Sequence, residues 1–176
     1  MKRRILFATC LTMMSLTIMS CDSDDDGPNC PEPLTGELNT TETEFTGKWS
    51  LTNIEADDEV DLTDDSVDNP STNIFEQYSA CQRDNVYEFK NDRAYSFKQG
   101  STETDCTNTQ TLSGTWMLNN NILTFVALCT SQSINIDLND DNNEFVIESN
   151  YTFVNVDNET INTKVVFTYQ KMDDPQ

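Results

Sequence analysis

Short segments in which apolar and polar residues alternate recur from residue 45 to residue 172, and this pattern restricts the fold more than any other feature. In residues 111–118, for example, Leu112, Gly114, Trp116 and Leu118 occupy alternate positions. Successive side chains of a β-strand point to opposite faces, so each such segment predicts a strand with one apolar face. The eight segments are residues 47–54, 84–90, 94–99, 111–118, 122–128, 133–138, 144–156 and 159–171.

Most connections between these segments are short and rich in Asn and Asp, which is typical of turns between antiparallel strands. A meander of eight strands has the right size for one closed barrel, and closure removes the edge strands that promote aggregation. We therefore predict an all-β fold, a single eight-stranded antiparallel up-and-down barrel over residues 45–172, followed by a C-terminal tail, residues 173–176. A β-sandwich is the alternative, because the number of strands does not separate the two folds.

Two neighbouring parts of this region do not alternate. Residues 55–72 carry eight acidic residues and Pro70, which predicts a long exposed loop. Long loops are often functional, so this one is a candidate lid or contact surface, with a plain solvated loop as the alternative. Residues 73–80 are expected to form one or two helical turns on the rim of the barrel.

Residues 1–20 have the layout of a secretory signal peptide, with three basic residues followed by a mostly apolar run over residues 5–19. This run is too short to cross a bilayer, which takes about 20 residues. It ends in Ile18-Met19-Ser20-Cys21, which resembles a bacterial lipobox. The resemblance implies cleavage before Cys21 and lipidation of its thiol. The alternative is an ordinary secreted protein in which Cys21 forms a disulfide.

Residues 22–44 are acidic and contain few large apolar residues, so they offer little surface to offset the entropy of ordering. We predict that residues 21–44 comprise the lipidated Cys21 and a flexible acidic tether. The acidic run 22–26 resembles the export signal that sends lipoproteins to the outer face of the outer membrane, which implies an anchored protein exposed at the cell surface. The alternatives are a solvated spacer and an anchor that faces the periplasm.

The charge and the absence of histidine exclude several classes of function. Removing residues 1–20 leaves 7 basic against 31 acidic residues, a net charge of −24, which repels nucleic acid and anionic membranes. No histidine is present, so the chain lacks the usual general base of a Ser or Cys triad and the commonest zinc ligand. We expect a protein that is not an enzyme, carries no cofactor and has no nucleic-acid partner.

One stretch of the sequence is echoed later in the chain. Residues 45–53 (FTGKWSLTN) recur in similar form as residues 112–120 (LSGTWMLNN). A Gly two residues before a Trp permits close crossing of strands, while the indole plugs an end of a barrel. The residues of this predicted barrel plug are Gly47, Trp49, Gly114 and Trp116.

The first copy of the echo resembles the Gly-x-Trp motif on the first strand of lipocalins. Most of residues 45–172 is similar to the lipocalin-like domain of bacterial surface lipoproteins, and the resemblance implies a lipocalin-like barrel. The last strand offers Lys164 and Lys171 where lipocalins have an Arg that packs on the Trp.

Four cysteines remain for disulfides once Cys10 and Cys21 are set aside, and an oxidising compartment favours two bonds. In a barrel, Cys81 and Cys106 flank the hairpin over residues 84–99 at similar distances from its turn, which makes them the first expected pair. Cys30 and Cys129 follow by elimination. This second bond would fold the tether along the barrel wall.

Aromatic residues on the inner positions of the strands either line a cavity or fill the barrel interior, and an eight-stranded barrel can do both. We expect the protein to bind a small apolar ligand, or a partner through the barrel mouth and rim loops. The alternative is a structural or accessory lipoprotein with a packed barrel. The candidate lining residues are Tyr87, Phe89, Tyr95, Phe97, Phe167 and Tyr169.

The spacing of Asp137, Asn139, Asp141 and Glu148 matches that of a calcium loop. Its flanks are predicted strands, whereas an EF-hand loop needs flanking helices. A hairpin turn rich in Asn and Asp accounts for the same residues. We therefore expect no metal site, with calcium at these four residues as the alternative.

Overall fold

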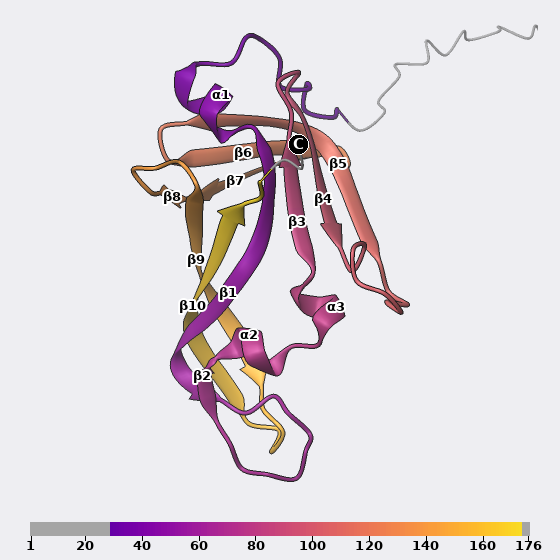
Figure 1. Cartoon of the computed structure of the whole chain (residues 1–176), viewed down its shortest axis with the longest axis vertical. Helices are drawn as coiled ribbons and strands as arrows, with labels where there is room; N and C mark the ends of the chain where they lie inside the picture. The colour runs from indigo at the N-terminus through magenta and orange to yellow at the C-terminus, as the bar shows by residue number, and fades with distance from the viewer. Residues whose placement is uncertain (1–28, 174–176) are drawn as a thin grey trace, which may run out of the picture.

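A computed structural model of the chain describes residues 29–173, in which ten strands and three short helices are present (Figure 1). The strands are β1 Gly47–Val60, β2 Ser71–Asn73, β3 Asn85–Phe89, β4 Ala94–Gln99, β5 Gln110–Asn119, β6 Ile122–Ala127, β7 Thr130–Asn135, β8 Asp137–Leu138, β9 Glu144–Val154 and β10 Thr160–Lys171. The helices are α1 Thr40–Phe45, α2 Ile74–Gln77 and α3 Ala80–Arg83. The predicted all-β antiparallel barrel is confirmed, and the helical turns expected near residues 73–80 are α2 and the start of α3.

The strands follow one another around the barrel in the order β7-β6-β5-β4-β3-β1-β10-β9-β8. The first strand, β1, pairs with the last strand, β10. Nine strands lie on this path rather than the predicted eight. The expected strand 133–138 is divided at Ile136 into β7, which pairs with β6, and β8, which pairs with β9. The count differs because one continuous segment changes its hydrogen-bonding partner half-way.

The barrel is not closed along its whole height. β8 pairs with β9 only through Asp137 and Leu138, opposite Val146 and Phe145. Beyond that point, within the described residues, β9 is paired on one side only, with β10. We call this gap between β7 and β9 the seam.

β1 is longer than expected. Residues 55–60 continue the strand instead of opening the predicted acidic loop, and β2 pairs with this extension. The exposed loop is therefore residues 61–70, although Asp61 at its start is buried. The four acidic residues among residues 55–60 hid the strand, because exposed charged residues of a strand look the same as loop residues in the sequence.

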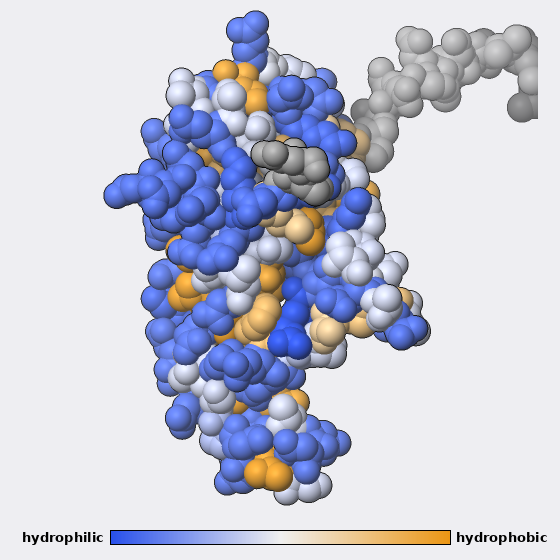
Figure 2. Space-filling model, in the orientation of Figure 1, coloured by the Kyte–Doolittle hydropathy of each residue, from blue (hydrophilic) through white to orange (hydrophobic). Residues whose placement is uncertain are grey.

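A dense aromatic core closes the end of the barrel next to α1. The Phe45 ring stacks on Trp49 at 4.8 Å between centroids and lies 5.9 Å from Trp116. The two tryptophans of the predicted plug therefore meet around one phenylalanine. Phe89 and Phe145 complete the cluster at 4.9 and 5.4 Å from Phe45. All five side chains are buried. On the outside of the protein, hydrophilic residues dominate the face that Figure 2 shows.

The two glycines before these tryptophans have different physical roles. Gly47 has a φ of +129°, a conformation that other residues rarely adopt. A Cβ atom on Gly114 would lie 2.1 Å from the carbonyl oxygen of Val126, so β5 and β6 approach too closely for any side chain there. The close crossing expected of a Gly-x-Trp segment is therefore present at Gly114.

Residues 29–44 differ from the predicted flexible tether. They are ordered on the barrel, and the N–H of Leu34 donates to the Thr115 hydroxyl at 2.8 Å. Asn39 caps α1 in a reciprocal capping box with Glu42. The ordered protein thus begins well before residue 45, and we refer to residues 29–45 as the N-terminal segment.

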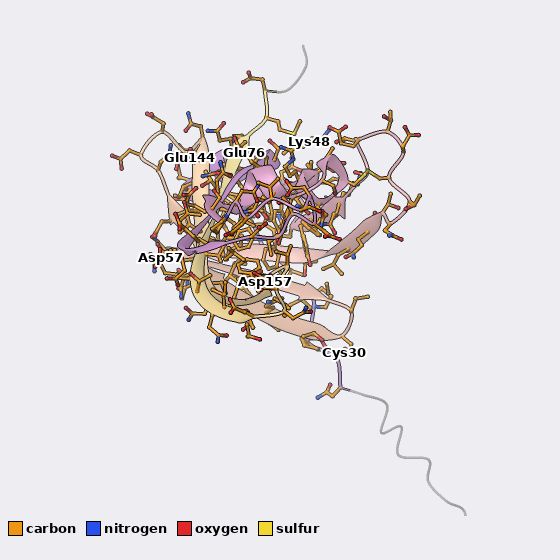
Figure 3. The ribbon with its side chains drawn as sticks, turned by 90° about the horizontal axis from the view of Figure 1, so that it is seen from below. Cys30, Lys48, Asp57, Glu76, Glu144 and Asp157 are labelled. Atoms are coloured by element: carbon orange, nitrogen blue, oxygen red, sulfur yellow. A yellow bond between two sulfur atoms is a disulfide. The ribbon has the colours of Figure 1, made fainter. Side chains whose placement is uncertain are left out.

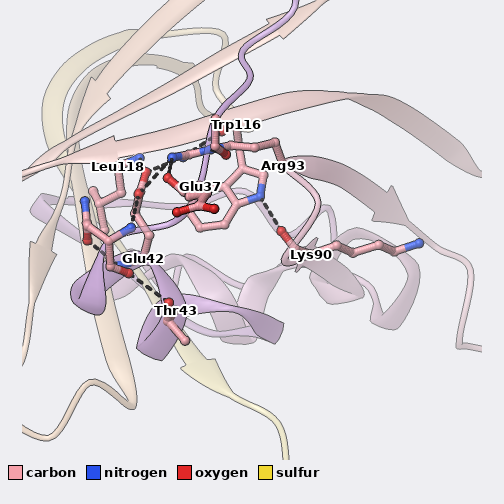
Figure 4. A network of polar contacts seen from close by, with 9 residues as sticks. Glu37, Glu42, Thr43, Lys90, Arg93, Trp116 and Leu118 are labelled. Atoms are coloured by element: carbon pink, nitrogen blue, oxygen red, sulfur yellow. Dashed lines mark hydrogen bonds and ion pairs between the residues drawn. The ribbon is translucent and has the colours of Figure 1, made fainter.

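A buried ion pair holds this segment in place (Figure 4). Glu42 of α1 pairs with Arg93, which follows β3 in the turn to β4, and the two side chains are only 2% and 6% exposed. Arg93 also donates from Nε to the carbonyl of Gly36 at 3.1 Å and from an Nη atom to that of Glu37 at 2.8 Å. Glu42 also accepts from the N–H groups of Asn39, at 2.9 Å, and Leu118, at 3.0 Å.

Burial alone would raise the pKa of Glu42, but hydrogen bonds from Arg93 and from the backbone N–H groups of Asn39 and Leu118 outweigh it and hold the pKa below its usual value. Glu42 is therefore ionised at neutral pH. Its charge is compensated inside the protein rather than by water.

Both predicted disulfides are confirmed, Cys81–Cys106 and Cys30–Cys129, with Cα–Cα distances of 5.6 and 4.6 Å. Cys129 lies in the two-residue turn between β6 and β7. The second bond therefore ties the start of the N-terminal segment to this hairpin. The predicted signal peptide, the lipidation site Cys21 and the first part of the predicted tether lie outside the described residues.

No helix among residues 29–173 is both long and apolar enough to cross a membrane.

Candidate functional site

A cavity of about 400 Å³ occupies the half of the barrel away from α1, below the aromatic core. It reaches the end where α2 and α3 lie (Figure 1), and both sides of the seam contribute residues to it. Its lining consists of Leu51, Ile54, Tyr78, Gln82, Asn85, Tyr87, Phe97, Gln99, Gln132, Ile134, Ile147, Ser149, Tyr151, Phe167 and Tyr169. Figure 3, seen from below, shows the ring of strands around the crowded interior, with Cys30 at its edge.

Strand alternation explains how these side chains come together. Residues 147, 149 and 151 of β9 are alternate positions and all line the cavity, as do residues 167 and 169 of β10. Tyr87 of β3 and Phe97 of β4 face each other in register across the hairpin, with ring centroids 4.8 Å apart. The cavity wall is thus the inner face of six strands.

The six candidate lining residues divide into two groups. Tyr87, Phe97, Phe167 and Tyr169 line the cavity. Phe89 and Tyr95 do not, because they are buried in the core, where Tyr95 packs on Phe125 at 4.7 Å between centroids. The barrel is therefore filled at one end and hollow at the other, so the two alternatives raised by the sequence each hold for half of it.

None of the lining side chains that the structure describes carries a formal charge, although 23% of the chain is charged. The polar groups are amides and hydroxyls instead. Asn85 is the most enclosed of the amides, with 8% of its surface exposed, and its side-chain NH₂ donates to the carbonyl oxygen of Gln82 at 2.7 Å. The other lining polar residues are Gln82, Gln99, Gln132 and Ser149.

Four tyrosines reach the cavity from four elements: Tyr78 after α2, Tyr87 from β3, Tyr151 from β9 and Tyr169 from β10. No hydrogen bond between described residues uses their hydroxyl groups, whereas every fully enclosed side-chain nitrogen or oxygen in residues 29–173 has a partner. Each of the four hydroxyls is therefore at least partly accessible to solvent. They are hydrogen-bonding groups that a ligand in the cavity can use.

The hydroxyls of Tyr78, Tyr87 and Tyr169 stay protonated under physiological conditions. Burial raises the pKa of Tyr87 to about 12, with smaller effects from Tyr95 and Tyr151, and burial also raises the pKa of Tyr169 and Tyr78. Each hydroxyl can therefore donate to an acceptor on a ligand. None of them serves as a base near neutral pH.

Tyr78, Tyr151 and Asn85 line the cavity but were not predicted from the sequence. The signal for Tyr151 was present, since it lies four residues after Ile147 on one strand face. Asn85 alternates with Tyr87 on β3, but a polar residue does not mark an inner position in the sequence. Tyr78 follows the short helix α2, where no alternation indicates the direction of a side chain.

The four residues considered for calcium are not gathered into one group in the part of the chain that the structure describes. Asn139 and Asp141 lie in the turn between β8 and β9, where the Asn139 side-chain oxygen accepts from the N–H groups of Asn143 and Glu144. Glu148 pairs with Lys164 on the exposed side of the sheet. Among the described residues, no group of three or more potential metal ligands is present, and Asp137 belongs to no such group either.

A second hollow, of about 800 Å³, lies outside the barrel and includes Lys48, Glu88, Lys171 and Asp173. Its wall is largely charged and polar, and it includes Asp173, the last residue that the structure describes. The cavity inside the barrel, with its fully described wall, is therefore the candidate site.

The sequence matches one protein family, described as "Domain of unknown function (DUF5004)", over residues 23–171. No curated protein matches the chain. The matched range begins before residue 45, which agrees with an N-terminal segment that is part of the folded domain.

Proposed function

This chain belongs to the DUF5004 family, and we propose that it is a binding protein rather than an enzyme, a lipid-anchored barrel that holds a small, largely apolar molecule in the cavity at its open end. The observation that carries the proposal is the uncharged, aromatic-lined cavity of about 400 Å³. This volume lies within the range of small-molecule sites, which are mostly apolar with a few placed polar groups.

The interior of the barrel supports binding in a second way. A packed barrel would bury its tyrosine hydroxyls against protein partners, because an unpaired buried hydroxyl costs free energy. Here Tyr87 and Tyr169 line the cavity, and their hydroxyls have no hydrogen-bond partner among the described residues and are not fully buried. The space itself is the feature that a purely structural barrel would not need.

The lipocalin resemblance gives further support. The Lys171 ammonium group lies 5.5 Å from the centre of the Trp49 ring, where lipocalins place an arginine on their tryptophan. Lys171 therefore places a cation next to the Trp49 ring, in the position that an arginine occupies in lipocalins. We propose a lipocalin-like barrel on this basis.

Replacement of Ile147 by Trp tests the proposed site, because the larger side chain would occupy the cavity. The unmodified protein is expected to bind the neutral fluorescent probe N-phenyl-1-naphthylamine saturably, with enhanced emission in an apolar site. Ile147→Trp should weaken this binding at least about tenfold, which corresponds to 1.4 kcal/mol.

Asn150→Trp is the matched control, since Asn150 lies on the same strand but on its exposed outer face. It should bind the probe as the unmodified protein does. Equal binding by both tryptophan variants, each folded by circular dichroism, would refute the site. Absence of any saturable binding would favour the structural, accessory role instead.

We also propose that Cys21 anchors the protein to the outer membrane, facing the cell surface, with a periplasmic orientation as the alternative. The two disulfides support an extracytoplasmic location, because such bonds persist in oxidising compartments. Several acyl chains on one residue suffice for stable anchoring.

Mass spectrometry of the membrane-extracted protein tests the anchor. We expect the mature chain to begin at Cys21 with acyl chains attached, and Cys21→Ser to appear in the soluble fraction. Cys10→Ser is the control, because Cys10 lies within the predicted signal peptide. An unmodified Cys21, or a different mature N-terminus, would remove the anchor from the proposal.

A further inference from the structure

The lining of the cavity indicates the chemical class of its ligand. Resting on the proposed function, we propose that the ligand is an organic cation with an alkylated ammonium group, held by the faces of the cavity aromatics. Six of the lining residues are aromatic and none is basic. Alkylated ammonium ions bind to such aromatic surfaces through the negative faces of the rings.

The aromatic side chains lie in two adjoining groups around the cavity. Tyr87 contacts Tyr169 edge to face at 5.3 Å between centroids, and contacts Phe97 at 4.8 Å. Tyr151 lies 5.2 Å from Phe167, with the planes tilted by 51°. Rings in these varied orientations surround one open cavity, which suits a roughly spherical alkylated ammonium group.

The charge of the protein favours a cation and disfavours an anion. The chain has a net charge of −21, and a low-dielectric cleft in such a field concentrates counter-ions. Two basic side chains near the cavity have partners outside its wall: Arg83 lies over the Phe75 ring at 5.1 Å, and Lys164 pairs with Glu148. Neither lines the cavity, so neither repels a cation there.

The same lining discriminates between cations. With no carboxylate in the wall, a primary ammonium group or a metal ion would lose its strong hydration without compensation. An alkylated ammonium group is more weakly hydrated and offers apolar methyl groups to the rings. The tyrosine hydroxyls and the amide of Asn85, which is 8% exposed, can then serve the neutral polar end of the ligand.

Choline and its uncharged isostere 3,3-dimethyl-1-butanol provide the test, as competitors for N-phenyl-1-naphthylamine on the whole disulfide-bonded protein. They share shape and hydroxyl group and differ in charge. Choline is expected to bind roughly tenfold more tightly than the isostere. Added salt should weaken choline binding and leave that of the isostere unchanged.

Variants at Tyr151 connect this preference to the rings. Tyr151 is 43% exposed, so its replacement should not impair folding. Tyr151→Leu should reduce the preference for choline, whereas Tyr151→Phe keeps the ring and should retain it. The preference is the ratio of choline affinity to isostere affinity within each variant, so a general loss of binding that weakens both ligands equally does not change it.

The outcomes separate the two proposals. If the neutral probe binds but choline is no better than the isostere, or neither competes, the organic-cation assignment is wrong and the proposed cavity stands. If the neutral probe does not bind, both proposals are wrong. A preference for choline that is unchanged in Tyr151→Leu and in Tyr169→Leu would also overturn the assignment to these rings.

Discussion

Arg93→Ala is expected to lower the free energy of unfolding by about 3–5 kcal/mol, because it leaves the Glu42 carboxylate buried without a cation. The loss includes the two hydrogen bonds that Arg93 gives to the carbonyl groups of Gly36 and Glu37. Urea unfolding with the disulfides intact measures the effect as a shift of the midpoint at constant slope.

Lys90→Ala serves as the matched control. Lys90 lies three residues earlier in the same turn and is exposed. Its recorded hydrogen bonds use backbone atoms: the N–H donates to the Ala94 carbonyl, and the carbonyl accepts from the Arg93 N–H and from the Trp116 indole N–H (Figure 4). Its replacement should change stability by no more than about 0.5 kcal/mol. The double variant Glu42→Leu/Arg93→Ala should cost less than the sum of the single changes, because no unpaired charge remains. A loss below about 1 kcal/mol for Arg93→Ala would contradict the assigned importance of the pair.

Removal of the Cys30–Cys129 disulfide by Ser at both positions should cost about 4–5 kcal/mol on the chain-entropy model, because the bond closes a loop with a sequence separation of 99. It also releases the start of the N-terminal segment from the β6–β7 turn. Thermal unfolding followed by circular dichroism provides the measurement.

The other disulfide provides the comparison. Cys81–Cys106 spans a separation of 25, so its removal should cost less, about 3–4 kcal/mol. The order of the two losses is the informative result. If the variant that lacks Cys81–Cys106 were the less stable one, local packing of the bonds rather than loop length would determine their contributions.

Much of the barrel could be predicted because strand alternation is a local property. β5 and β10 emerged close to their expected ranges, and the pairing of Cys81 with Cys106 followed from their positions around one hairpin. The division of residues 133–138 into β7 and β8 could not be predicted. It depends on which strand lies beside each half, and that is a tertiary property.

The N-terminal segment shows a different limit. Glu42 is one acidic residue among many, and in the sequence nothing distinguishes it from solvated neighbours. Its burial depends on Arg93, 51 residues away. A buried charge pair of this kind has no local pattern, so the segment was assigned to a flexible tether.

The candidate site was predicted in part for a similar reason. Alternation placed Tyr87, Phe97, Phe167 and Tyr169 on the inner face correctly. It could not distinguish the filled level of the barrel, which contains Phe89 and Tyr95, from the hollow level, because both belong to the same face of the same strands. Only the positions of α1 and the tryptophans decide which level is filled.

The bond between Cys30 and Cys129 also determines what a protease can do to this protein. Residues 30–129 form a covalently closed loop, and the exposed loop 61–70 lies within it. A single cut anywhere between these two cysteines leaves all pieces joined through the disulfide. A protein nicked within this loop would therefore stay attached to whatever its N-terminus holds until the disulfide is reduced or the chain is cut before Cys30.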